Sequence, residues 1–116
     1  MSRKTPNRIA PKRQRDPAPI FAALGDNTRL ALVSKLSAGH PRSISDLTEG
    51  SLLTRQAITK HLQVLQRAGL VHNFRSGREN FFELDPESIE ELKKYLDHVS
   101  HQWDQKLARL KAFVEG

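Results

Sequence analysis

The residues of this sequence with the clearest chemical potential lie between positions 53 and 70, in LTRQAITKHLQVLQRAGL. Apolar residues recur there at steps of three and four, which predicts a helix with one face toward a core: Ala57, Ile58, Leu62, Leu65 and Ala68. The opposite face carries hydrogen-bonding and cationic side chains: Thr54, Arg55, Gln56, Thr59, Lys60, Gln63 and Arg67. No acidic residue occurs between Ser51 and Asn73, so the charge of this face has one sign. The pattern favours a recognition helix for DNA; the alternative is a basic surface helix without a special role.

The composition of the whole chain agrees with a polyanionic partner and excludes several classes of site. The net charge is +6 and the isoelectric point about 10.1, which attracts nucleic acid or anionic membrane surfaces. The absence of cysteine excludes disulfides, thiolate metal sites and cysteine nucleophiles. No nucleophile–base–acid set and no glycine-rich phosphate loop stands out, so we predict a protein that is not an enzyme and has no cofactor.

The segments that precede this helix predict one domain behind a basic tail. Residues 1–17 are rich in Lys, Arg and Pro, and such a segment is expected to be disordered. It is either an arm that follows a phosphate backbone or a solubilising leader. Residues 18–116 suffice for one compact domain. No apolar run reaches the roughly 20 residues that span a bilayer, and no apolar region follows the basic start, so we expect no membrane partner and a cytoplasmic, nucleoid-associated protein.

Two helices are predicted at the start of the domain. Residues 19–24 form a short apolar helix with a proline at its start. A second helix follows, with Asp26 or Asn27 as its cap, and is apolar on most sides, which suits a central buried helix. Arg29 lies in the first turn of this helix, where the positive end of the helix dipole disfavours a cation. We therefore expect it to pair with an acid or a phosphate.

A helix-turn-helix is predicted next. Residues 43–49 are expected to form a short helix with Ser45 as its N-cap and Leu47 as its core contact, with Ile44 as a single strand residue before it. A turn that contains Gly50 connects it to the helix of residues 53–70. A short helix, a turn of about four residues and a second helix are the components of that motif.

A β-hairpin is predicted after the recognition helix. Residues 71–75 form one strand and residues 80–84 the other, with a tight turn at Ser76-Gly77. Arg75 and Arg78 flank its tip. A hairpin in this place is a wing whose arginines can enter the minor groove or hold phosphate; the alternative is a plain hairpin with surface arginines.

The last helix is predicted to begin after Asp85, with Pro86 at its first position, and to run to Val114. Its apolar residues step by three or four along a length that one small core cannot cover. We therefore predict a dimer interface along the stripe formed by Leu92, Leu96, Val99, Trp103, Leu107 and Leu110. The alternative is a helix that folds wholly against its own chain.

Three segments resemble the ArsR-type (arsenical-resistance repressor) winged-helix regulators: FAALGDNTRLALVSKL, LTRQAITKHLQVLQRAGLV and the tip RSGRE. Thr59 stands where serine is usual, and Asn27 replaces a common proline. The resemblance implies a mainly α winged helix-turn-helix with about five helices and a two-stranded wing. It also implies a homodimer built from the first and last helices, which adds Ile20 and Phe21 to the interface, and a repressor of a pseudo-palindromic operator on double-stranded DNA.

Carried over residue by residue, the resemblance implies DNA contacts on the recognition helix and the wing: Thr54, Arg55, Gln56, Thr59, Lys60, His61, Arg75 and Arg78. His61 enters this set only through the resemblance, because its place beside Leu62 favours a structural histidine.

The family's metal sites are not matched. His98 and His101, with Asp97 or Asp104, could hold zinc, but their spacing departs from the family's pattern, so we predict no metal site and an unknown effector, if one exists. Two other functions stay open: a non-specific nucleoid-type DNA-binding protein, and a protein-interaction module that docks through the long helix.

Overall fold

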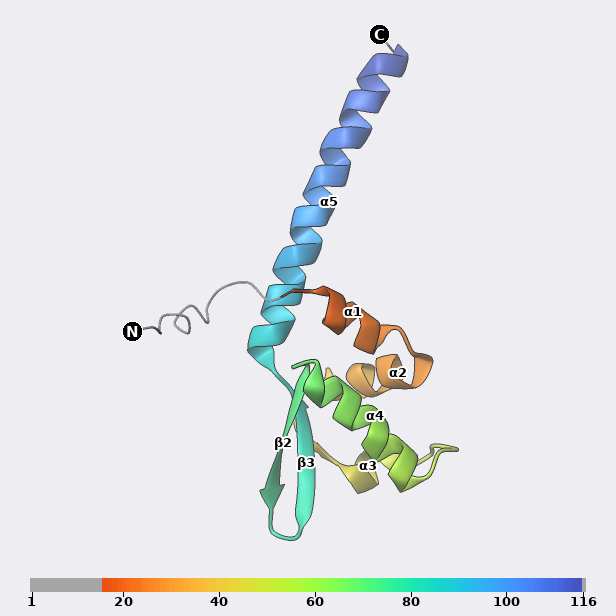
Figure 1. Cartoon of the computed structure of the whole chain (residues 1–116), viewed down its shortest axis with the longest axis vertical. Helices are drawn as coiled ribbons and strands as arrows, with labels where there is room; N and C mark the ends of the chain where they lie inside the picture. Colours follow the sequence, from red (N-terminus) through yellow and green to blue (C-terminus); the bar gives the residue numbers. More distant parts are fainter. Residues whose placement is uncertain (1–15, 116) are drawn as a thin grey trace, which may run out of the picture.

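The computed structural model describes residues 16–115; the predicted tail of residues 1–17 lies almost entirely outside this range. Five helices and three strands occur in the described part of the chain, and a long last helix projects from a small body (Figure 1). The elements in order are α1 (Ala18–Leu24), α2 (Asn27–Leu36), β1 (Arg42–Ser43), α3 (Ile44–Thr48), α4 (Arg55–Arg67), β2 (Val71–Ser76), β3 (Glu79–Leu84) and α5 (Pro86–Glu115).

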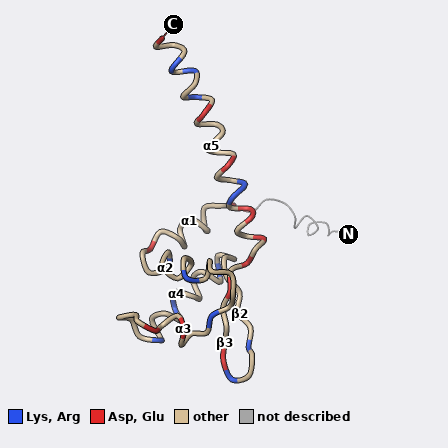
Figure 2. The backbone as a smooth tube through the Cα atoms, turned by 180° about the vertical axis from the view of Figure 1, so that it is seen from behind, with Lys and Arg blue, Asp and Glu red and all other residues tan. Residues whose placement is uncertain are grey.

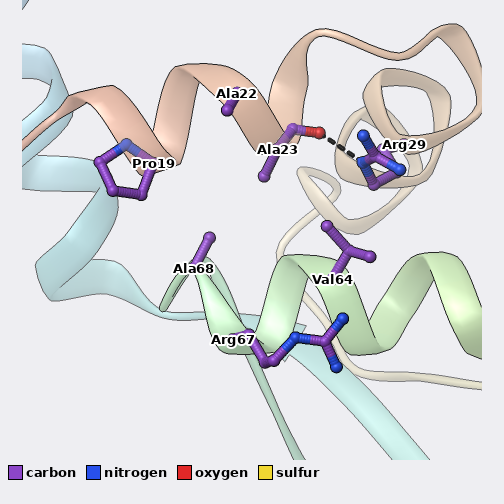
Figure 3. Close-up of a pocket in the computed structure, with 7 residues that line it drawn as sticks. All are labelled: Pro19, Ala22, Ala23, Arg29, Val64, Arg67 and Ala68. Atoms are coloured by element: carbon purple, nitrogen blue, oxygen red, sulfur yellow. Dashed lines mark hydrogen bonds between the residues drawn. The ribbon is translucent and has the colours of Figure 1, made fainter.

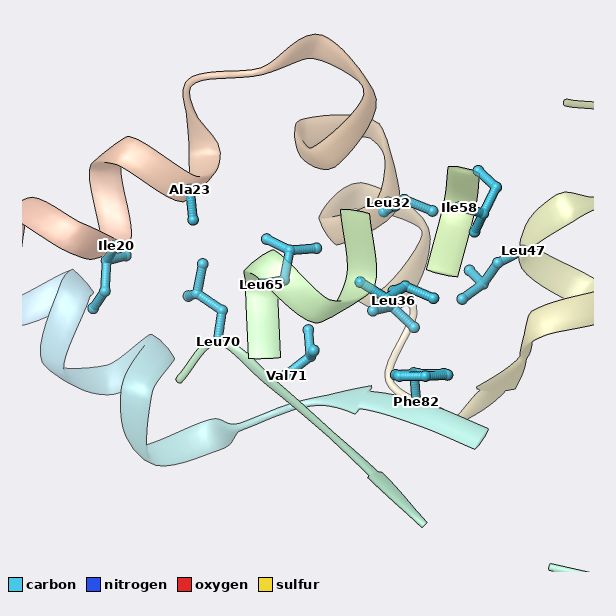
Figure 4. Packing of buried hydrophobic residues seen from close by; sticks show 11 residues of the cluster. Ile20, Ala23, Leu32, Leu36, Leu47, Ile58, Leu65, Leu70, Val71 and Phe82 are labelled. Atoms are coloured by element: carbon cyan, nitrogen blue, oxygen red, sulfur yellow. The ribbon is translucent and has the colours of Figure 1, made fainter. Parts of the chain in front are cut away.

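A single hydrophobic core joins the helices of the body to the sheet (Figure 4). Helix α4 contributes Ile58, Leu62 and Leu65, all at most 2% exposed. Each fully buried leucine stabilises the fold by about 1.5–3 kcal/mol relative to an exposed one. The rest of the core comes from the surrounding elements: Ile20, Ala23, Leu32, Leu36, Leu47, Leu70, Val71 and Phe82. The stripe predicted for α4 and the core role predicted for Leu47 are therefore confirmed.

The sheet has three antiparallel strands in the order β1-β3-β2, one more than the two-stranded wing that the sequence predicts. The hairpin itself is confirmed, with Val71 opposite Leu84 and Ser76 opposite Glu79. The turn contains Gly77, whose φ of 65° is a left-handed conformation that glycine adopts without steric cost. The additional strand places Arg42 opposite Phe82, and its two residues are too few to show an alternating pattern.

Helix α3 begins earlier than a cap at Ser45 would allow. Ser43, not Ser45, is its N-cap: the Ser43 hydroxyl accepts a hydrogen bond from the Asp46 N–H, and the Asp46 carboxylate accepts one from the Ser43 N–H. This reciprocal capping box satisfies two backbone donors at once, which a cap at Ser45 would not. Ile44, predicted as a strand residue, is the first residue of the helix.

The caps of α2 and α4 agree with the sequence prediction. The Asp26 carboxylate accepts from the Arg29 N–H at 3.0 Å, and the Thr54 hydroxyl accepts from the Ala57 N–H at 3.1 Å. Gly69 follows α4 with a φ of 84°, as expected for the residue that ends a helix.

Helix α2 is less buried than the sequence suggests. Only Leu32 and Leu36 of this helix are buried, whereas Leu30 is 51% exposed. Its apolar residues surround the helix, but α1 and α4 cover one side of it. The prediction of a central helix buried on most sides is therefore wrong.

Helix α5 has 30 residues, a length of about 45 Å at 1.5 Å per residue. Its first turns pack on the body through Ile89 and Leu92. The buried Ser88 hydroxyl donates to the Gly69 carbonyl, and the Asp85 N–H donates to the Leu70 carbonyl at 2.9 Å. From Ser100 to Glu115 every residue is exposed, so no other part of the chain within residues 16–115 covers the second half of the helix (Figure 1).

The two serines of α3 give a matched test of its capping. We expect Ser43→Ala to lower the free energy of unfolding by about 1 kcal/mol, because the variant cannot form the capping box. Ser45→Ala, which removes the same atom two residues later, breaks one solvent-exposed hydrogen bond from Arg55 and no cap, and should change it by less than about 0.5 kcal/mol. Urea unfolding followed by circular dichroism measures both; equal decreases in the two variants would contradict the assignment of the cap.

Candidate nucleic-acid interface

The outer face of α4 is open to solvent along its whole length. Arg55, Gln56 and Lys60 are exposed and Thr59 is half-buried. Together with the first residue of α3 they border a groove of about 550 Å³, lined by Ile44, Arg55, Gln56, Thr59, Lys60 and Gln63. The lining contains two cations, no carboxylate and three side chains that hydrogen-bond, which suits contacts with phosphate and with base edges.

Arg55 is held in place by a residue that the sequence analysis assigned to another role. Its Nη1 donates to the Ser45 Oγ at 2.8 Å, which links the first turn of α4 to α3. One of the five N–H donors of the guanidinium is used in this contact, and the other four stay available. Ser45 is thus a positioning residue. Because Arg55 and Ser45 are ten positions apart, no short-range pattern in the sequence predicts their contact.

Two threonines keep hydrogen-bonding capacity on α4: Thr59 in the groove and Thr54 at the N-cap of the helix. The Thr59 hydroxyl donates to the Arg55 carbonyl at 2.8 Å, so its oxygen lone pairs can still accept. The Thr54 hydroxyl oxygen already accepts from the Ala57 N–H, so its proton can still be donated. Each is therefore suited to a different kind of contact.

His61 lies on the side of α4 that faces the start of α2. Its Nδ1 is 3.3 Å from the Arg29 Nη1 and 3.7 Å from the Asp26 Oδ2. Because a guanidinium can only donate, a hydrogen bond between the two side chains uses the His61 Nδ1 as the acceptor, and the Asp26 carboxylate lies at longer range. This contact favours the structural role that the residue pattern suggested, and it leaves Nε2 for any contact with DNA.

The sequence predicts a direct contact of Arg29 with an acid or a phosphate. In the structure its side chain makes its contacts with other groups. Its Nε donates to the Ala23 carbonyl at 2.6 Å, and its Nη1 reaches His61. Asp26 is nearby: the pKa of its carboxyl is lowered, first by the hydrogen bond from the Arg29 N–H and further by the charge of the Arg29 guanidinium. The stability from this cap is present above the ordinary pKa of aspartate and is lost as the pH falls through the lowered value.

The wing places its cations at the same end of the molecule as α3 and α4. Arg75 and Arg78 are exposed, and Figure 2 shows positive charge at the hairpin tip, far from the end of α5. Arg75 pairs with Asn80 on the face of the hairpin that also carries the buried Phe82. The wing therefore directs Arg75 to the side on which the body of the protein lies.

Comparison with known proteins decides the family. The family described as "Bacterial regulatory protein, arsR family" matches residues 26–73. The HTH-type transcriptional regulator Rv2034 of Mycobacterium tuberculosis is 35% identical over 83 residues, which are 72% of this chain and 77% of that protein. The chain belongs to the ArsR family. It is a DNA-binding transcriptional regulator, and its relatives form a class without enzymes.

Two further relatives support the same assignment. The uncharacterized HTH-type transcriptional regulator YuzN of Bacillus subtilis is 38% identical over 81 residues, 65% of this chain and 88% of that protein. The solved structure of an ArsR-like transcriptional regulator from Rhodococcus sp. RHA1 is 34% identical, with a TM-score of 0.70 over 83% of this chain and 90% of that one. The winged helix-turn-helix architecture is thereby confirmed.

The residues predicted for an ArsR-type dimer divide into two groups. Phe21, Leu96, Trp103, Leu107 and Leu110 are between 39% and 58% exposed, and Val99 is half-buried. Ile20 is only 3% exposed and has almost no surface left for a partner, so we reassign it to the core. Leu92 is partly buried against the same core. Tyr95, which the sequence analysis did not include, is 41% exposed and has its ring centroid 5.9 Å from that of Phe21.

The described region was compared with the requirements of a metal-ligand cluster and of a membrane-spanning helix. Within residues 16–115 no group of three or more His, Asp or Glu side chains is arranged to hold a metal ion; His98 and His101 are both exposed on α5. In the same region no helix combines the length and the apolar character that crossing a bilayer requires.

Proposed function

We propose that this ArsR-family regulator is a homodimeric repressor that binds a pseudo-palindromic operator with α4 and the wing, on the nucleoid in the cytoplasm. The observation that carries the proposal is the open face of α4, which has one sign of charge and lies at the same end of the molecule as the arginines of the wing (Figures 1 and 2). The major groove of B-form DNA is wide enough to admit an α-helix such as α4.

The side chains of this face divide by chemistry into two roles. Arg55, Gln56 and Thr59 read base edges: arginine suits guanine, glutamine suits adenine, and a hydroxyl serves either. Thr54, Lys60 and the N-terminus of α4 hold phosphates, with His61 Nε2 as a further donor. Arg75 and Arg78 follow the backbone or the minor groove beside the wing.

A second copy of the chain is the occupant we propose for the exposed apolar side chains of α1 and α5. Six of them lie on α5 beyond Tyr95: Leu96, Trp103, Leu107, Leu110, Phe113 and Val114. Apolar exposure on this scale marks an interaction surface, and a helix of about 45 Å matches another helix of equal length. Pairing two chains this way would present two α4 helices to half-sites about one helical turn apart.

Selection from random duplex DNA with the purified full chain tests the function. We expect enrichment of an inverted repeat, bound at least about 10³-fold more tightly than a scrambled duplex of equal length at physiological salt. Competition by fluorescence anisotropy measures the ratio. A steep salt dependence without preference for the selected duplex would show a non-specific nucleoid-type protein instead, and no DNA binding would leave a protein-interaction module.

The wing is tested by Arg78→Ala on the selected duplex. We expect weaker binding, and a slope of log K against log salt that is shallower by about one for each phosphate that Arg78 neutralises in the complex. Arg109→Ala, which removes an equal charge from exposed α5, is the control. If Arg78→Ala and the control leave the same affinity and slope, the wing does not contact DNA.

The interface on α5 is tested by Trp103→Glu. In the dimer, the glutamate carboxylate would be buried between two apolar helix faces, and this burial of a charge costs free energy. We therefore expect this variant to be a monomer in sedimentation or light-scattering measurements. Gln102→Glu adds the same charge one residue away, outside the stripe, and should keep the assembly of the wild type. Dimers of Trp103→Glu would place the interface elsewhere.

A further inference from the structure

A hollow of about 390 Å³ lies between α1 and the C-terminal half of α4 (Figure 3). Its walls are apolar and mostly small: Pro19, Ala22 and Ala23 on α1, and Val64 and Ala68 on α4. Alanine methyl groups on both helices leave the space that larger side chains would fill. The volume lies near the lower end of the range of small-molecule sites, about 300–1,000 Å³, which indicates a small ligand.

Two guanidinium groups also border this hollow, and no carboxylate does. Arg29 lines it from the first turn of α2, and Arg67 from the last turn of α4. The contacts to the Ala23 carbonyl and to His61 use two of the five donors of Arg29, and Arg67 is exposed. An open apolar hollow with two cations at its border complements a molecule with a short hydrocarbon body and one anionic head. A guanidinium binds a carboxylate by charge-assisted hydrogen bonds, bidentate where both oxygens are reached.

The hollow is connected directly to the recognition helix. Val64, Arg67 and Ala68 belong to α4 itself or to its C-cap. Arg29 contacts His61, the residue next to Lys60 on the same helix. An anion bound to Arg29 would compete with His61 for the guanidinium and neutralise a positive charge that lies against α4, the helix that borders the groove. Occupation of the hollow would therefore oppose DNA binding.

We propose that the hollow between α1 and α4 is an effector site for a small aliphatic monocarboxylate, held by Arg29 and Arg67, that releases the protein from its operator. The release rests on the proposed function, whereas the binding of the carboxylate does not. By linkage, operator DNA weakens carboxylate binding by the same factor as the carboxylate weakens operator binding.

Binding is tested by calorimetry on the full chain with hexanoate, octanoate and decanoate, and with octan-1-ol and octylamine as uncharged and cationic probes. We expect saturable binding of at least one carboxylate and none of the alcohol or amine. Arg67→Gln should weaken that binding about tenfold or more, because it removes a charged hydrogen-bond donor. Ala22→Leu, a change at an exposed helical position, should abolish it by filling the hollow. Arg109→Gln is the matched charge control and should bind as the wild type does.

Release is tested by titrating the selected operator duplex in the presence of the bound carboxylate. We expect the operator affinity to fall by about 5- to 150-fold, and Ala22→Leu to bind the operator as the wild type does but without response to the carboxylate. Carboxylate binding without any effect on the operator would overturn the regulatory role. Absence of binding for all three carboxylates, or equal binding of octylamine, would overturn the site.

The two proposals fail in different ways. If no duplex is selected, the proposed repressor function is wrong, and calorimetry still decides whether the hollow binds a carboxylate. If the carboxylates do not bind and Ala22→Leu instead changes the oligomeric state, the hollow is an interface between copies and the effector proposal is wrong.

Discussion

The structure depends on one constraint: α4 must bury one side completely while the other stays in water. Leu62 and Leu65 are fully buried, and Ile58 is nearly so. Burial of these three side chains contributes several kcal/mol, so rotation of the helix about its axis is strongly disfavoured. The orientation of Arg55, Gln56 and Lys60 follows from it, because residues on one helix keep fixed angular relations. The surface that we propose for DNA contact is therefore set by packing on the opposite side of the same helix.

The periodic elements could be predicted from the sequence because their signals lie within one segment. The stripe of α4, the caps at Asp26 and Thr54, the hairpin and the long α5 all appear as spacings of a few residues, and the structure contains each of them. The exposed polar face of α4 could be predicted for the same reason, because once the apolar side of an amphipathic helix is assigned to the core, its other side must face the solvent.

The features that were missed depend on contacts between segments. β1 exists because Arg42 and Ser43 pair with β3, not because two residues favour a strand. The hydrogen bond from Arg55 to Ser45 and the burial of Ile20 are likewise decided by how helices pack. The exposure of Leu30 on α2 has the same origin, because an apolar residue shows by its type that it can be buried, but not whether anything covers it. The hollow between α1 and α4 results from how the two helices pack, so the sequence of neither helix alone predicts it.

The junction of α4, the wing and α5 has a mechanical consequence. The Ser88 hydroxyl binds the Gly69 carbonyl, and the Asp85 N–H binds the Leu70 carbonyl, so the end of α4, both ends of the hairpin and the start of α5 meet within a few residues. Such a junction has little freedom to bend. Helix α5 is about 45 Å long. A small tilt of this helix would therefore rotate the hairpin and α4 together as one unit. In the proposed dimer, the spacing between the two α4 helices would then be adjusted from the far end of the molecule, without local unfolding at the groove.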